Sequence, residues 1–183
     1  MSEEILIRQG APTLAGIKTG SLFPCPCEDR EDLLADIRRL NRRLSPKRLC
    51  LLPIRFLAGR ALLYLYRPAE LRRDLRDARV SELLRQAGYE DESCARCVAR
   101  LACRFCESGE FPHKVGLFLS YPPEDVKGFI AHRANDFKCA GLWKVYGDEE
   151  KARALFAKYK KCTEIYCALW QSGSRLEQLA VAV

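Results

Sequence analysis

Hydrophobic residues along the chain recur at two different spacings, which predict helices in some segments and strands in others. Between residues 33 and 44, apolar side chains recur every three or four positions, which predicts a helix that Asp29 can cap. Two β-rich runs follow, Arg48–Phe56 and Arg60–Tyr66, and the short Leu57-Ala58-Gly59 connection between them predicts a hairpin.

Similar patterns place further elements along the rest of the chain. The expected helices are 2–9, 68–76, 80–87, 94–108, one that starts at Pro122-Pro123, and 148–170. The expected strands are 21–23, 114–119 and 141–146. Gly10 and Pro12 should end the first helix, and Pro24 should end the strand at 21–23. Ile130 and Leu169 are expected on the buried faces of their helices.

These elements predict an α+β fold in which several helices flank a small mixed sheet. No internal repeat, linker or low-complexity segment interrupts the sequence, so we expect residues 1–183 to form a single domain. No apolar run approaches the roughly 18–20 residues that span a bilayer, so we expect no membrane segment. Glu3 and Glu4 stand where a secretory signal would need basic residues.

Ten cysteines are the first chemical feature of the sequence. A chain of 183 residues can bury a full core without disulfide bonds, so we expect reduced thiols and a cytoplasmic location. Four of the cysteines have a spacing that resembles a metal site, namely Cys94, Cys97, Cys103 and Cys106. A continuous helix, with about 3.6 residues per turn, would nevertheless point Cys94 and Cys103 in opposite directions.

We therefore predict no cofactor and interpret the cysteines as packed core residues. The alternative is a metal or thiol-redox protein, with zinc or an iron–sulfur cluster as cofactor. A metal could use one cysteine pair together with Cys25, Cys27, Cys139 or His113. Redox chemistry could use Cys94 and Cys97 at the start of their helix, where the helix dipole lowers a thiol pKa.

Charge is the second chemical feature. Residues 30–85 contain 15 Lys and Arg against 7 Asp and Glu, a net charge of +8 in a chain of net charge +7. Such a segment could bind nucleic acid or an acidic partner. No nucleic-acid-binding motif accompanies it and aromatic residues are not interleaved with the arginines, so nucleic acid is an alternative that we do not favour.

Three stretches, Ala11–Phe23, Phe111–Val126 and Trp143–Gly147, together resemble a bacterial family that is common in clostridia and known as domain of unknown function 3793. The resemblance spans nearly the whole chain and implies no activity. It does imply that Lys18, Thr19, His113, Tyr121 and Asp125 belong to one pocket. Members of that family often have cysteine at the positions of Gly10 and near Phe137, and the lack of cysteine there disfavours a shared metal site.

We expect a protein that binds a small molecule or anion at the loops around Lys18 and His113–Tyr121. Loop residues more often serve binding or catalysis than the packing of the core. Catalysis is neither indicated nor excluded by these residues. The partner and the oligomeric state are not predictable from the sequence.

Overall fold

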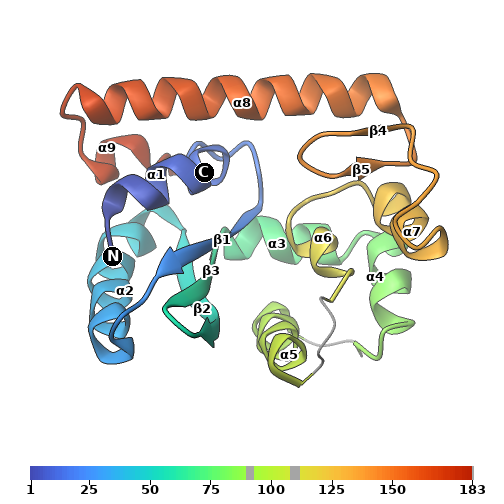
Figure 1. Cartoon of the computed structure of the whole chain (residues 1–183), viewed down its shortest axis with the longest axis horizontal. Coiled ribbons are helices and arrows are strands. Elements are labelled where there is room, and N and C mark those ends of the chain that lie inside the picture. Colours follow the sequence, from blue (N-terminus) through green and yellow to red (C-terminus); the bar gives the residue numbers. More distant parts are fainter. Residues whose placement is uncertain (90–92, 108–111, 183) are drawn as a thin grey trace. The chain divides into compact units, whose positions relative to one another are not determined.

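The computed structural model describes residues 1–89, 93–107 and 112–182 (Figure 1). The chain divides into two compact units, each described by itself below: unit 1 is Met1–Glu70 with Lys161–Val183, and unit 2 is Leu71–Lys160. The α+β class predicted from the sequence is confirmed. The prediction of a single domain over residues 1–183 stays a prediction.

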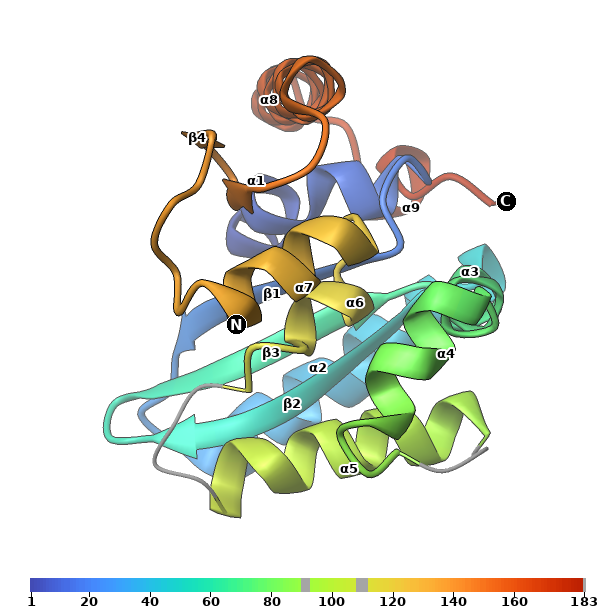
Figure 2. The same ribbon diagram turned by 90° about the vertical axis from the view of Figure 1, so that its right-hand side faces the viewer.

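The sheet of unit 1 has three strands: β1 (Gly20–Pro26), β2 (Cys50–Leu57) and β3 (Arg60–Tyr66). Figure 2 shows β3 between the other two, and both pairings are antiparallel. The predicted hairpin is therefore confirmed as β2–β3. The expectation of a mixed sheet is wrong, because every strand pair in the described residues is antiparallel.

One face of this sheet forms the core of unit 1. Leu63 of β3 pairs with Phe23 of β1, and alternate residues along the strands lie on the same face. These side chains share one buried cluster with four helical segments: α1 (Glu3–Leu14), α2 (Arg30–Leu44), α9 (Leu176–Leu179) and the end of α8 (Glu149–Gln171). The cap of α2 is Asp29, as predicted, and a short 3₁₀ helix, η1 (Ser45–Lys47), follows it.

Two elements of unit 1 continue through prolines that were expected to end them. Helix α1 runs past Pro12 to Leu14, where Gly10 lets the helix approach β3 so closely that an added Cβ would lie 2.7 Å from Leu65. Strand β1 runs to Pro26, and both Pro24 and Pro26 are exposed on this edge strand. Tertiary packing explains the first correction, and the second follows because an edge strand tolerates residues without an N–H group.

Arg67 ties both ends of the chain to the sheet. Its side chain is 1% exposed and donates from Nε to the Thr13 carbonyl at 2.8 Å. From Nη2 it donates to the carbonyls of Leu14 and Val181, also at 2.8 Å. Burial lowers the pKa of Arg67 below its usual range, and nearby Glu70 partly offsets that effect. A planar fork of donors suits this role, because several carbonyls are satisfied by one side chain.

A second tie in unit 1 is an ion-pair network. Arg43 of α2 donates to Glu3 of α1 and to Glu177 of α9, including one bond of 3.1 Å to Glu177 Oε2. The Arg43 guanidinium lowers the pKa of Glu177 to about 2. The network therefore joins the first and last helices of the chain through α2.

Replacing Glu177 with glutamine should make stability less dependent on pH. The folded pKa of Glu177, about 2, lies below the usual value of 4.5, so its carboxylate stabilises the fold above pH 4.5 and loses this effect as pH falls towards 2. Because the side chain is 41% exposed, we expect the loss at pH 7 to be only about 1 kcal/mol. Urea unfolding at pH 7 and pH 2.5 measures this. The control is Glu164→Gln, on the exposed side of α8; an equal loss at both pH values would contradict the prediction.

Unit 2 is mostly helical. Its first helix, α3 (Pro68–Leu75), starts in unit 1, and α4 (Ala78–Arg85), α5 (Cys94–Glu107), α6 (Val115–Phe118) and α7 (Pro123–Ala131) follow. A short hairpin of β4 (Cys139–Ala140) and β5 (Lys144–Val145) precedes α8, which belongs to unit 2 up to residue 160. Helix α7 contacts α4, α6 and β5.

The predictions for unit 2 have mixed outcomes. The helices at 68–76, 80–87 and 148–170 are confirmed, and Gly88 has the positive φ of 75° that suits a residue after a helix. The strand predicted at 114–119 is wrong, because these residues form the short helix α6, and most of the strand predicted at 141–146 is loop. Ile130 and Leu169 are exposed. The helix end predicted at Gly109 lies outside the described residues.

Within the described ranges, no helix combines the length and apolarity needed to cross a bilayer.

Candidate functional site

The five residues expected to share a pocket are divided between the two units. Lys18 and Thr19 belong to unit 1, whereas His113, Tyr121 and Asp125 belong to unit 2. Lys18 is half-buried, and burial lowers the pKa of its amine to about 8. The Thr19 carbonyl accepts a hydrogen bond of 3.0 Å from the Arg67 backbone N–H. A pocket shared by all five residues stays a prediction.

Asp125 has a structural role in unit 2. Its carboxylate is 3% exposed and accepts hydrogen bonds from the Trp143 indole N–H at 2.7 Å and from the backbone N–H groups of Tyr146 and Gly147 at 2.8 and 2.7 Å. These bonds hold the segment around β5 against α7. Tyr121 lies on the same Trp143, with ring centroids 4.6 Å apart. The structure thus brings Tyr121 and Asp125 together around an indole ring.

His113 is exposed, and its ring lies 5.1 Å from that of Phe129. Burial raises the pKa of Tyr121, and the nearby Tyr159 raises it further. A tyrosine with a raised pKa stays protonated at neutral pH, so it is not an activated base. The polar residues of this region are therefore arranged for packing.

The four cysteines of α5 do not gather around one point. Because α5 is continuous, Cys97 is buried and Cys94 half-buried, whereas Cys103 and Cys106 are exposed. The described residues contain no group of three or more His, Cys, Asp and Glu side chains that could hold a metal ion. All ten cysteines lie in the described ranges, and none of them forms a disulfide bond.

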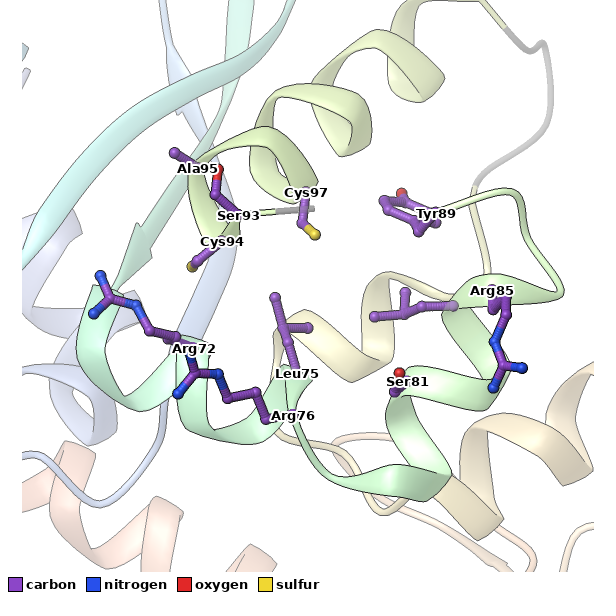
Figure 3. Close-up of a pocket in the computed structure, with 11 residues that line it drawn as sticks. Arg72, Leu75, Arg76, Ser81, Arg85, Tyr89, Ser93, Cys94, Ala95 and Cys97 are labelled. Atoms are coloured by element: carbon purple, nitrogen blue, oxygen red, sulfur yellow. The ribbon is translucent and has the colours of Figure 1, made fainter. Parts of the chain in front are cut away.

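A pocket of about 890 Å³ lies between α3, α4 and the first turn of α5, entirely within unit 2 (Figure 3). Leu75, Leu84 and Tyr89 supply the apolar part of its lining. Three arginines supply positive charge: Arg72 of α3, Arg76 just after α3, and Arg85 of α4. The rest of the wall is formed by Ser81, Ser93, Cys94, Ala95 and Cys97.

The described charged residues of this pocket are all positive. No carboxylate is among the lining residues that the structure describes. Arg85 forms an ion pair with Glu82 outside the pocket lining. Arg72 and Arg76 have no ion pair with a carboxylate in the described part of the chain. Figure 3 shows Arg72 on α3 and Arg76 at its end.

The α5 wall is held in place by two arginines that do not line the cavity. Arg100 and Arg104 donate to the carbonyls of Gly88 and Ala87, just after α4. The Arg104 guanidinium also lies 5.1 Å from the centre of the Tyr89 ring. Cations at the carboxyl end of a helix are favourable, so α5 is fixed to the end of α4.

Cys94 reports on the environment of the pocket. Burial raises the pKa of its thiol, and the nearby Arg72 guanidinium offsets only part of this effect. A thiol with a raised pKa is neutral at pH 7, unlike reactive redox cysteines, whose pKa is lowered. The pocket therefore offers cationic and apolar groups but no activated nucleophile at Cys94.

A second pocket of unit 2, about 560 Å³ between α4 and α7, differs in charge. Lys114 and Lys127 line it together with Glu82 and Glu124, and Arg79 lies 3.8 Å from Glu124. Side chains of both signs compensate one another there. The arginine-lined pocket is therefore the better candidate for a charged ligand.

The sequence indicated the basic segment and the Cys94-x2-Cys97 pair but not the pocket in which they meet. One signal could have found it: Arg72 and Arg76 are four residues apart and therefore share a helix face with Leu75 between them.

The fold and this pocket define an α+β protein with an arginine-lined pocket in its second unit. Over residues 6–180 the chain matches the family described as Protein of unknown function (DUF3793), and it belongs to that family. No curated protein and no solved structure matches it. The clostridial source expected from the sequence stays a prediction.

Proposed function

We propose that this protein binds a small anionic molecule in the arginine-lined pocket of unit 2. One observation carries the proposal: Arg72 and Arg76 present two guanidinium groups, neither paired with a described carboxylate, on one wall of a pocket of about 890 Å³. Arginine forks bind phosphate and carboxylate groups through two parallel hydrogen bonds. Leu75 and Leu84 give the rest of the ligand an apolar surface.

The proposal keeps the anion-binding function expected from the sequence but moves the site away from Lys18 and His113–Tyr121. It includes a cytoplasmic location, which the ten cysteines without disulfide bonds support. Whether the protein is also an enzyme is left open.

The two alternative functions have less support. A redox role is disfavoured by the raised pKa of Cys94. For nucleic-acid binding, much of the basic segment is engaged within the protein: Arg43 binds Glu3 and Glu177, Arg67 binds carbonyls, and Arg85 binds Glu82. Fewer cations therefore remain for a phosphate backbone.

The test replaces both Arg72 and Arg76 with glutamine and measures binding of inorganic phosphate to the full chain by calorimetry at low ionic strength. Each charge-assisted hydrogen bond contributes about 1.5–3 kcal/mol, so the double variant should bind at least about tenfold more weakly. Arg73→Gln is the matched control, because Arg73 lies on the same exposed helix but does not line the pocket. Equal losses in both variants, or no binding of either phosphate or pyrophosphate by the unaltered protein, would refute the proposal.

A further inference from the structure

We propose that the ligand of this pocket carries two linked phosphate groups, a diphosphate, on an apolar or aromatic body. This inference rests on the proposed function and specifies its ligand. The observations that carry it are the positions of Arg72 and Arg76 at the end of α3, the apolar lining beyond them and the size of the cavity.

The spacing of Arg72 and Arg76 favours two adjacent anionic groups over one. Arg72 lies in α3, Arg76 is the first residue after that helix, and both line the same wall of the pocket. The two guanidinium groups therefore form neighbouring forks, and each fork can bind one phosphate group through two hydrogen bonds. A single phosphate would have to share its oxygens between the two forks, whereas a diphosphate supplies a separate acceptor group to each.

The charge of the site agrees with this assignment. Arg72 and Arg76 together supply two positive charges without a described carboxylate to compensate them, and the described lining residues include no carboxylate. The hydroxyl groups of Ser81 and Ser93 line the same cavity and can donate to further phosphate oxygens. A monocarboxylate would use only a fraction of these donors.

The apolar part of the lining favours a ligand that has an apolar or aromatic group besides its phosphates. Leu75, Leu84 and Tyr89 line the cavity, and its volume of about 890 Å³ is within the range of about 300–1,000 Å³ that small-molecule ligands occupy. An apolar or aromatic body attached to the diphosphate would cover these side chains. Nucleoside diphosphates and prenyl diphosphates share this chemistry.

Arg85 provides an internal control for the effects of Arg72 and Arg76 on binding. It lines the cavity, but it is already paired with Glu82. Its charge is therefore locally compensated, and its loss should matter much less than the loss of Arg72 or Arg76. A pocket that merely attracted anions by total charge would be weakened similarly by removing any one of the three.

The test measures by calorimetry the dissociation constants of the full chain for inorganic phosphate, pyrophosphate, adenosine diphosphate and a short-chain prenyl diphosphate. We expect pyrophosphate to bind at least about tenfold more tightly than phosphate. One of the two organic diphosphates should bind more tightly than pyrophosphate, and this result would identify the apolar or aromatic part of the ligand. Arg72→Gln and Arg76→Gln should each weaken pyrophosphate binding at least about tenfold, and Arg85→Gln and Arg73→Gln less than about threefold.

The outcomes separate the two proposals. Equal affinity for phosphate and pyrophosphate, or equal losses for Arg72→Gln and Arg85→Gln, would overturn the diphosphate assignment and leave anion binding in place. If neither organic diphosphate binds more tightly than pyrophosphate, the assignment of an apolar or aromatic body to the ligand would be overturned. If no anion of the set binds, the proposed function itself fails.

Discussion

Replacing Asp125 with alanine is expected to lower the free energy of unfolding of unit 2 by about 3–5 kcal/mol. The substitution leaves three donors without their acceptor: the indole N–H of Trp143 and the backbone N–H groups of Tyr146 and Gly147. Each buried donor that loses its acceptor costs about 1–3 kcal/mol. Urea unfolding followed by the fluorescence of Trp143 measures the change.

Two further variants test the explanation. Asp125→Asn keeps one oxygen for the backbone N–H groups, so it should lose less than Asp125→Ala. Tyr121→Phe keeps the ring on Trp143 and removes only a hydroxyl that lies 3.5 Å from the Leu142 carbonyl, so it should change stability by less than about 1 kcal/mol. If Asp125→Ala were as mild as Tyr121→Phe, a structural role for this carboxylate would be untenable.

Arg67→Met is expected to destabilise unit 1 by a comparable amount, about 3–5 kcal/mol. Methionine fills much of the space but removes the side-chain donor to the carbonyls of Thr13, Leu14 and Val181. Arg67→Lys should recover only part of the loss, because one ammonium group cannot reproduce the planar fork. Chemical denaturation of the three proteins gives the comparison.

The matched control is Arg60→Met, at the exposed start of β3, the strand that ends just before Arg67. No hydrogen bond involves the Arg60 side chain within the described ranges, so its replacement should change stability by less than about 0.5 kcal/mol. Equal effects at the two positions would show that the carbonyl contacts of Arg67 contribute nothing.

Elements with local signals were predictable from the sequence, and elements fixed by tertiary contacts were not. Helix α2 has a cap at Asp29 and a regular apolar stripe, and the β2–β3 hairpin has a glycine turn, so both were correct. Helix α6 is a short apolar segment buried on all sides, and such a run has no period that separates helix from strand. Helix α1 passes Pro12 because its contact with β3 outweighs one missing hydrogen bond.

The stretches that resemble the family contain close contacts. An added Cβ on Gly116 would lie 2.9 Å from Val126, and one on Gly147 would lie 2.6 Å from Glu124. Asp125 and Trp143 are joined by a hydrogen bond, and Thr13 and Ser21 by another of 2.9 Å between their hydroxyls. These contacts give several residues of the stretches a packing role, and a pocket formed by them stays a prediction.

The arginine-lined pocket could not be assembled from the sequence because three helices contribute to it. Arg72, Ser81 and Cys94 come from different elements, and no local pattern states that these elements meet. Only the spacing of Arg72 and Arg76 was visible beforehand. The net charge of residues 30–85 pointed to the right region but included arginines that serve the fold, among them Arg43 and Arg67.

The most direct test of the anion site is nuclear magnetic resonance of the uniformly ¹⁵N-labelled full chain during a titration with pyrophosphate. We expect saturable shifts of backbone amide signals at residues 72–76, 81 and 93–97, which line or adjoin the pocket. Shifts confined to residues 18–20 and 113–121, or no saturable shift at all, would contradict binding at this site.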